Sequence, residues 1–122
     1  MPHRPLRDRS DEDLITAIAR DEDAQAALSE LVDRHQAAVY RLASHVTRNV
    51  ATAEDVLQDT FLSVLRAAAT FRAESTGRAW LMSIARHAAW KRGRREQLMQ
   101  SLDERSLEAL GREAGWGAED AE

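Results

Sequence analysis

The sequence contains no cysteine among its 122 residues, and only two prolines and five glycines. The absence of cysteine excludes disulfides, cysteine-based zinc sites and a cysteine nucleophile. The scarcity of proline and glycine argues against a loop-rich or all-β protein. No apolar run approaches the ~20 residues that a membrane-spanning helix needs. The charged start MPHRPLRDRS has no apolar segment behind it, so it does not resemble a secretory signal. We therefore expect a cytoplasmic chain without membrane insertion.

Enzyme signatures are also absent from the sequence. It has no glycine-rich phosphate loop and no HExxH motif, and its histidines at 3, 35, 45 and 87 are scattered. His35 and His45 would lie roughly 15 Å apart on one helix, too far to share a metal ion. His35 falls on an apolar stripe, which favours a core or boundary histidine over a ligand. The sequence thus predicts a protein that is not an enzyme, without a metal site or cofactor.

The composition favours helices. Hydrophobic residues make up 43% of the chain and charged residues 31%, and alanine, leucine, arginine and glutamate are abundant. These residues are good helix formers, so we expect an all-α, compact bundle of about four helices. The formal net charge is −4, but it is uneven. Residues 1–95 carry 15 Lys and Arg against 13 Asp and Glu, whereas residues 96–122 carry two against eight, so an acidic tail hides a mildly basic body.

Hydrophobic spacing predicts where the helices lie. We expect a disordered N-terminal tail over residues 1–9, a helix capped by Ser10 and running to Arg20, and a long helix from Ala24 to Arg48. A third helix opens at Thr52, in a capping-box spacing with Asp55, and ends near Thr70. After a loop, a fourth helix covers Gly77–Arg95, a short one covers Ser101–Arg112, and the last residues are disordered.

Apolar residues at three- and four-residue steps mark the expected buried stripe of each long helix. In the second helix these are Leu28, Leu31, Val32, His35, Val39, Leu42, Ala43 and Val46. In the third they are Leu57, Phe61, Val64, Leu65 and Ala68, and in the fourth Trp80, Leu81, Ile84, Ala85 and Ala88.

The stretch RHAAWKRGRR, residues 86–95, gathers five cations and a tryptophan without any acid. Cations at a helix C-terminus offset the macrodipole, and that alone would explain some of them. Five exceed what the dipole needs, however, and the aromatic residues Phe71, Trp80 and Trp90 lie on or beside the same element. Cations that hold phosphates, next to rings that stack on bases, are typical of single-stranded DNA binding. Phe71 and Trp80, each taken alone, are more readily explained as core residues.

The third helix begins with a cluster of acidic and amide side chains, namely Glu54, Asp55, Gln58 and Asp59. Most of them lie off the apolar stripe and face outward. The cluster is either an acid-decorated first turn or a surface that offers carboxylates and an amide to a basic partner.

Together, AEDVLQDTFLSVLRAAATFR and RAWLMSIARHAAWKRGRR resemble region 2 of a bacterial sigma factor, closest to the extracytoplasmic function group. The resemblance covers about residues 10–96. No single piece is specific, but the ordered set is. The residues that carry it are Glu54-Asp55, Gln58-Asp59, Phe61, Phe71, Trp80-Leu81 and Ile84-Ala85-Arg86.

The resemblance implies a small helical domain that docks on the β′ clamp helices of core RNA polymerase and binds the minus-ten promoter element. By resemblance, the polymerase-binding residues are Asp55, Gln58, Asp59 and Phe61. An unstacked base of the non-template strand would enter a pocket near Phe71, Ser75, Thr76 and His87, close to Trp80. Backbone phosphates would be held by Arg78, Lys91, Arg94 and Arg95.

This chain departs from the family pattern at two positions. His87 stands where the family usually has asparagine, and Lys91 stands where it often has aspartate. Histidine can still donate or accept a hydrogen bond, but its reach and charge differ. The base preference of a relative should therefore not be transferred to this chain.

The family also implies a C-terminal helix-turn-helix domain, and residues 97–122 look like the acidic linker that leads to it. The sequence leaves open whether the chain is a piece of a longer protein or a shortened natural one. An anti-sigma factor is a further expected partner. The alternative function is a protein-interaction module that docks polymerase or an anti-sigma factor without productive DNA binding.

Overall fold

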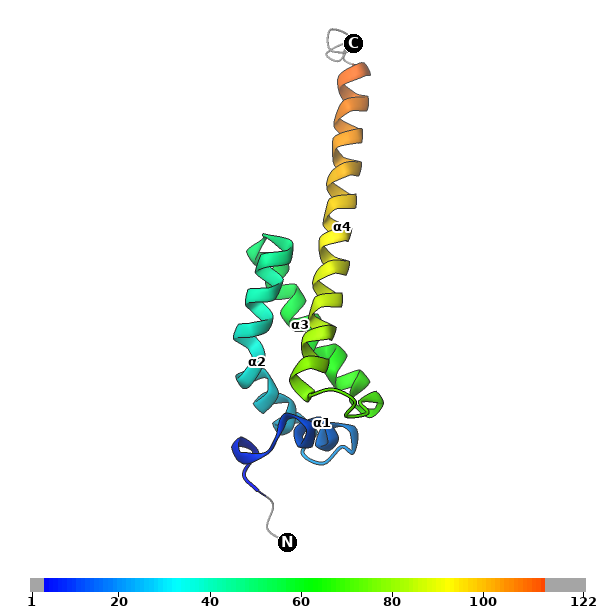
Figure 1. Cartoon of the computed structure of the whole chain (residues 1–122). Coiled ribbons are helices and arrows are strands. Elements are labelled where there is room, and N and C mark those ends of the chain that lie inside the picture. The colour runs from blue at the N-terminus through cyan, green and yellow to red at the C-terminus, as the bar shows by residue number, and fades with distance from the viewer. Residues whose placement is uncertain (1–3, 114–122) are drawn as a thin grey trace. The chain divides into compact units, whose positions relative to one another are not determined.

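The computed structural model describes residues 4–113 and, within them, every side chain but those of residues 107, 108 and 110–113. The described residues contain four α-helices and two 3-10 helices, with no strand (Figure 1). In chain order they are η1 (Leu6–Asp8), α1 (Asp11–Ala19), α2 (Ala24–Thr47), α3 (Val50–Ala67), η2 (Ala68–Thr70) and α4 (Gly77–Glu113). This confirms the expected all-α bundle. Two units meet within α4, one ending at Arg92 and the other beginning at Gly93.

Short polar side chains start the helices, as their sequence context predicts. The Ser10 hydroxyl accepts the backbone N–H of Asp13 at the start of α1, and the Thr76 hydroxyl accepts that of Ala79 at the start of α4. The expected cap of α3 is wrong by three residues. Asn49, not Thr52, is the cap, because its side-chain oxygen accepts the Thr52 backbone N–H and α3 already begins at Val50.

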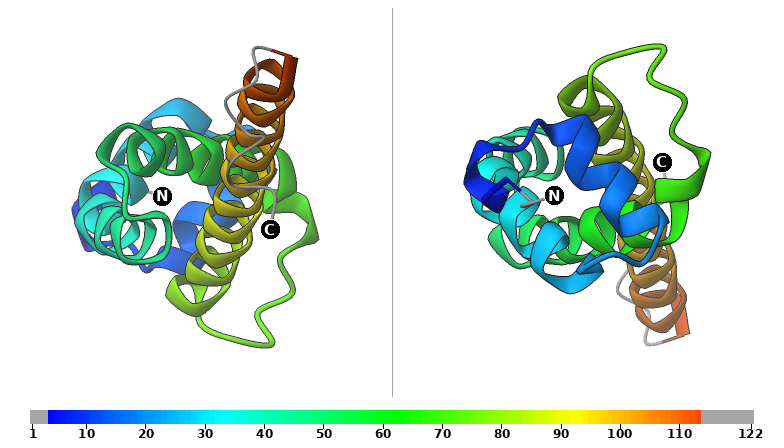
Figure 2. Two further views of the ribbon diagram at one scale, coloured as in Figure 1. Left: turned by 90° about the horizontal axis from the view of Figure 1, so that it is seen from above. Right: turned by 90° about the horizontal axis from the view of Figure 1, so that it is seen from below.

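The helices of the first unit pack around one main core. Figure 2 shows α1 crossing one end of α2 and α3, while Figure 1 shows α3 returning along α2 after the turn at residues 48–49. Arg48 makes this reversal in a left-handed backbone conformation. The largest fully buried side chains are Leu14, Ile15, Leu31, Leu81, Val39, Val56, Val64 and Thr60. They come from all four α-helices, so burial of apolar area joins the helices into one unit.

Two expected core residues lie at the surface. Val46 is 43% exposed and Leu65 is 44% exposed, although both continue an apolar stripe. Conversely, Val56, Thr60 and Ala89 are fully buried without being expected in the core. Thr60 can be buried because its hydroxyl donates to the backbone carbonyl of Val56.

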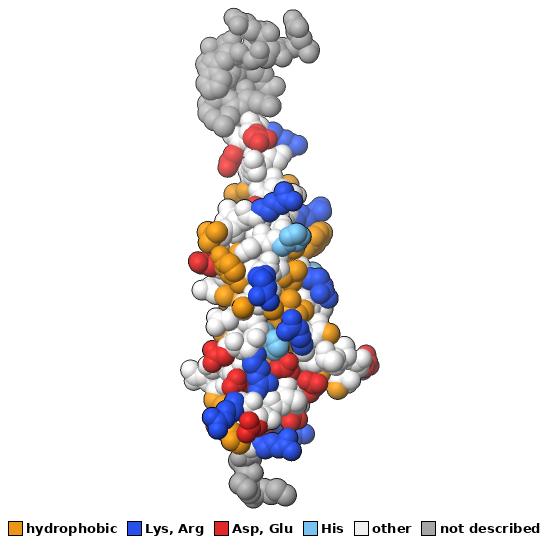
Figure 3. Space-filling view, turned by 60° about the vertical axis from the view of Figure 1, so that its left-hand side comes forward, with side chains coloured by type: hydrophobic (Ala, Val, Ile, Leu, Met, Phe, Trp, Pro, Cys, Tyr) orange, Lys and Arg blue, Asp and Glu red, His pale blue; other side chains and the backbone are white. Residues whose placement is uncertain are grey.

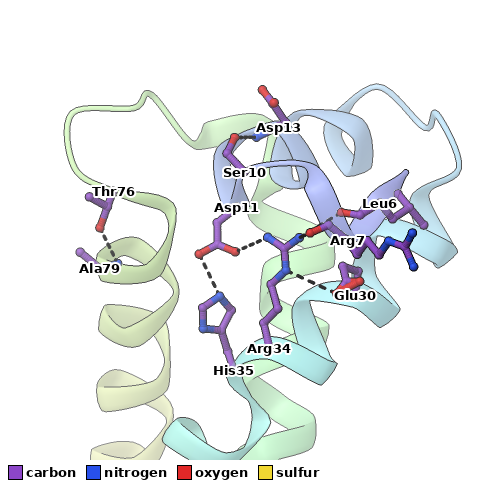
Figure 4. Close-up of polar contacts among 10 residues, drawn as sticks. All are labelled: Leu6, Arg7, Ser10, Asp11, Asp13, Glu30, Arg34, His35, Thr76 and Ala79. Atoms are coloured by element: carbon purple, nitrogen blue, oxygen red, sulfur yellow. Dashed lines mark hydrogen bonds and ion pairs between the residues drawn. The ribbon is translucent and has the colours of Figure 1, made fainter. Parts of the chain in front are cut away.

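The N-terminal segment is attached to the bundle, which differs from the disordered tail expected for residues 1–9. Leu6 packs against the core, and the Arg34 guanidinium donates to the carbonyl oxygens of Leu6 and Arg7 at 2.9 and 3.1 Å. The same guanidinium contacts the carboxylate of Asp11 (Figure 4). Residues 1–3 lie outside the described part of the chain.

The fourth helix is longer than expected. The sequence predicts an end at Arg95 and a separate short helix over Ser101–Arg112, whereas α4 continues to Glu113. Residues 96–100 contain neither proline nor glycine, so nothing in them interrupts the hydrogen bonds of the helix backbone. The expected disordered end, residues 115–122, lies outside the described residues.

Gly77 lets α4 begin directly against α1, and we expect Gly77→Ala to destabilise the fold. A Cβ atom at this position would lie 2.9 Å from Asp11 Cβ and 3.0 Å from Ile15 Cδ1. Because Asp11 Cβ is attached directly to the backbone and Ile15 is buried in the core, neither can move aside freely, and we expect a loss of about 1–3 kcal/mol in the free energy of unfolding. Chemical denaturation measures this loss.

Gly93→Ala is the matched control, because a Cβ atom there would meet nothing within 4 Å. It removes a glycine from a helix interior and should stabilise the chain by up to about 1 kcal/mol. Equal effects of the two substitutions would contradict the close approach of α4 to α1.

Candidate interaction surfaces on α3 and α4

The first candidate surface is the outer face of α3. Its polar part consists of Glu54, Asp55, Gln58 and Asp59, all in the first three turns after the Asn49 cap. Asp55 and Asp59 have 55% and 35% of their side chains exposed, and Gln58 is exposed between them. Residues three and four apart are neighbours on a helix, so these side chains form one patch. The structure thus brings three of the expected polymerase-binding residues together.

Phe61 does not belong to this patch. It is only 7% exposed and its side chain lies in the main core. We therefore assign no direct docking contact to the Phe61 ring, although the sequence predicts one. Its burial instead fixes α3 against the other helices.

The α3 outer face continues into two apolar side chains. Leu62 and Leu65 are 48% and 44% exposed, and they follow Gln58 by four and seven residues. This spacing places them on the same helix face as Gln58. Sequence reasoning missed Leu62 and assigned Leu65 to the core, although their spacing from Gln58 was readable in the sequence.

Arg92 of α4 forms ion pairs with two carboxylates of the acidic patch. Its Nε and Nη2 atoms donate to the two carboxylate oxygens of Asp59 at 2.7 and 3.2 Å, and its Nη1 lies 3.8 Å from Asp55 Oδ2. Two-point contact with a carboxylate suits the planar guanidinium. In the sequence Arg92 is one of the cations of the basic helix end, but in the structure its guanidinium contacts α3.

The second candidate surface comprises the loop 71–76 and the start of α4. Phe71 and Trp80 contact each other across the loop, with ring centroids 5.2 Å apart and a tilt of 58°. Both rings also pack against the main core and are half-buried. Their first role is therefore to close the loop onto the bundle, which is the simpler of the two interpretations raised by the sequence.

The polar residues expected at the DNA pocket are exposed, but they differ in the hydrogen bonds that their side chains make. Thr76 uses its hydroxyl to cap α4, and the hydroxyl of Ser75 donates to the Thr76 carbonyl at 3.3 Å. Ala73 turns the loop with a φ of 56°, a left-handed conformation that is costly for alanine. The Thr76 cap and the packing of Phe71 thus connect both ends of the loop to the bundle.

Basic and aromatic side chains are exposed on α4 within the first unit. Arg78, His87 and Lys91 are exposed, and the rings of His87 and Trp90 stack at 6.5 Å. Arg94 and Arg95 are exposed as well, but they belong to the second unit. His87 and Lys91, four residues apart, thus share one exposed face of α4, whereas Arg78 lies nine residues before His87 and projects from about the opposite side of the helix.

Positive charge is not confined to α4. Figure 3 shows one face of the molecule on which Lys and Arg side chains are spread among hydrophobic ones. A charge-based interaction with DNA would therefore depend on which cations lie beside suitable rings, and not on the basic helix end alone.

Comparison with known proteins gives a family match. Residues 31–98 match the family model for Sigma-70 region 2. The chain is 42% identical over 66 residues to the RNA polymerase sigma factor CarQ of Myxococcus xanthus, an alignment that covers 54% of this chain and 38% of CarQ. It is 37% identical over 89 residues to the ECF RNA polymerase sigma factor SigM of Mycobacterium tuberculosis, covering 72% of this chain and 44% of SigM.

A third relative, the ECF RNA polymerase sigma factor SigX of Bacillus subtilis, is 31% identical over 70 residues, covering 57% of this chain and 36% of SigX. The chain spans less than half the length of each of these curated relatives. Among the helices of residues 4–113, none combines the length and the apolar character needed to cross a membrane.

Proposed function

The chain belongs to the Sigma-70 region 2 family, in its extracytoplasmic function branch, and from this premise we propose that it binds core RNA polymerase and promoter DNA to start transcription. In this proposal it recognises and melts the minus-ten element and works in the cytoplasm, where the polymerase is. The observation that supports it best is the exposed α3 outer face, which presents two carboxylates and an amide on one patch.

We place polymerase docking on that face, through Asp55, Gln58 and Asp59. A basic groove or helix pair, such as the β′ clamp helices implied by the family resemblance, would complement these carboxylates. Leu62 and Leu65 extend the same face with exposed apolar area, which a docking partner would bury. An apolar centre beside charged residues is the usual composition of a protein interface.

We place DNA binding on the loop 71–76 and on α4. Arg78 and Lys91 would contact backbone phosphates, while Ser75 and Thr76 would lie near an unstacked base of the non-template strand. His87 follows Thr76 by 11 residues of α4, roughly 16 Å along the helix axis, so we do not place it in the same pocket. Phe71 and Trp80 would form the side of this pocket that faces the core, because their rings pack against each other and against the core. For the second unit, taken by itself, we propose that Arg94 and Arg95 also contact backbone phosphates.

The proposal is tested by asking whether the chain gives core polymerase an affinity for single-stranded DNA. A labelled non-template oligonucleotide is titrated with core polymerase, with and without the chain, and its fluorescence anisotropy is recorded at several salt concentrations. We expect the chain to bind the oligonucleotide weakly by itself and much more tightly when core polymerase is also present. The logarithm of the affinity should fall with that of the salt concentration, by a slope of about −0.7 per phosphate contact.

Lys91→Ala should make this slope shallower by about 0.7, since it removes one contact. Polymerase binding without any gain in DNA affinity would favour the alternative function, a protein-interaction module that docks polymerase or an anti-sigma factor. A chain that binds neither polymerase nor DNA would contradict the proposal as a whole.

A further inference from the structure

Trp90 is unusually accessible for a tryptophan. Its side chain is 57% exposed. The other large hydrophobic side chains that are exposed within residues 4–113 are all aliphatic. Tryptophan carries the largest apolar surface of any side chain, so leaving it in water is costly unless a ligand covers it. Trp90 lies one turn after His87, on the exposed side of α4 within the first unit.

The neighbouring side chains give this ring a defined orientation. The His87 ring stacks with it at a centroid distance of 6.5 Å and an interplanar angle of 28°. We call these two rings the Trp90 platform. Its orientation contrasts with the Phe71–Trp80 pair, whose rings are half-buried and tilted by 58°. Of the two aromatic pairs, the Trp90 platform is the more exposed.

The charge around the platform favours a nucleic acid as the ligand. Arg86 and Lys91 flank it and are exposed, and the sequence has no acid between Arg78 and Arg95. The nearest acidic patch, on α3, is contacted by Arg92, so its carboxylates face a cation of the chain itself. An aromatic ring among cations suits an unpaired base with its phosphates, because the base stacks while the cations neutralise the backbone.

We infer that the Trp90 platform is a stacking site for an unpaired base of single-stranded DNA, separate from the pocket at the loop 71–76. This inference rests on the proposed function, and it adds a second base contact about four helix turns along α4 from Thr76. The stacking would be sequence-tolerant, because every base has an aromatic face. It would therefore increase affinity for melted DNA without selecting a particular base.

The test compares Trp90→Leu and Trp90→Phe in the whole chain, using fluorescence anisotropy of a labelled single-stranded oligonucleotide. Leucine keeps an apolar side chain but removes the ring, and we expect it to weaken binding about tenfold. Phenylalanine keeps a ring and should retain most of the affinity. Neither substitution removes a charge, so the salt dependence should stay that of the native chain.

An oligonucleotide with abasic sites throughout provides the decisive control, because it carries the same phosphates without bases. Trp90→Leu should bind this probe as well as the native chain does. An equal loss on both probes, or no loss on either, would overturn the inference. A change in oligomeric state or in polymerase affinity caused by Trp90→Leu, with unchanged DNA affinity, would also overturn it, since the ring would then cover a protein surface.

The outcome for the proposed function is read separately, from polymerase binding. A native chain that binds polymerase, with a Trp90→Leu variant of unchanged DNA affinity, would refute the platform alone. A native chain that stacks bases through Trp90 but does not bind polymerase would refute the proposed function alone. Circular dichroism confirms that each variant is folded, which we expect because Trp90 is outside the core.

Discussion

Asp59→Arg is expected to weaken binding of the chain to core RNA polymerase by about 30-fold or more, the effect of losing a contact worth about 2 kcal/mol at the centre of an interface. The carboxylate lies on the α3 outer face with 35% of its side chain exposed. Reversing its charge would repel a basic partner and would also place a second cation beside Arg92. Titration of the labelled chain with core polymerase at fixed salt measures the effect.

Arg92→Ala separates docking from structural support. It removes the same ion pair as Asp59→Arg does, but it leaves the carboxylate on the surface. Because such half-exposed pairs contribute about 1 kcal/mol or less to stability, both variants should stay folded. We expect Arg92→Ala to bind polymerase with an affinity within about threefold of the native value. A threefold change corresponds to less than 1.4 kcal/mol, the free energy that changes an affinity tenfold. If both variants lose affinity equally, the ion pair itself, and not a docking contact of Asp59, accounts for the loss.

Asp11→Ala is expected to lower the free energy of unfolding by about 3 kcal/mol. This value lies at the upper end of the usual cost of an unsatisfied buried group and at the lower end of that of a broken buried ion pair. Asp11 joins α1 to α2 through both carboxylate oxygens (Figure 4). One accepts from Arg34 Nη1 at 3.1 Å, and the other lies 2.9 Å from His35 Nε2. Since an ionised carboxylate can only accept, Nε2 of His35 carries the proton.

His35 explains why this loss is large. Its side chain is only 6% exposed, and its Nδ1 atom is already buried without a hydrogen-bond partner among the described residues. Without the Asp11 carboxylate, neither ring nitrogen would have an acceptor or donor within reach. Arg34 would keep Glu30 at 3.4 Å and the two carbonyls of the N-terminal segment.

Two further variants, measured in the same way by urea denaturation, serve as controls for this prediction. Asp11→Asn keeps the size of the side chain and one acceptor oxygen, so it should cost clearly less than Asp11→Ala. Asp33→Ala removes an exposed acid from α2 and should change stability by no more than about 0.5 kcal/mol. If Asp11→Ala behaves like Asp33→Ala, the contacts of Asp11 do not stabilise the bundle.

Local features of the fold could be read from the sequence because they depend on neighbours along the chain. The bounds of α1 and α2 were predicted to within one residue, and Ser10 caps α1 as expected. These features follow from backbone hydrogen bonding and helical periodicity over a few residues. The same periodicity brought Asp55, Gln58 and Asp59 onto one face of α3. That they bind polymerase stays a prediction.

Contacts between helices were decided only by the tertiary structure. Asp59 and Arg92 are 33 residues apart, and Asp11 and His35 are 24 apart, so no local pattern couples them. Periodicity shows which face of a helix is apolar, but not how far that face is covered. For that reason Leu65 was placed in the core and yet is exposed, while Phe71 and Trp80 gave no sign of their contact. The depth of a side chain and the partner of a charge depend on how the packed helices are rotated and shifted against one another, which is set by the fit of many side chains at once.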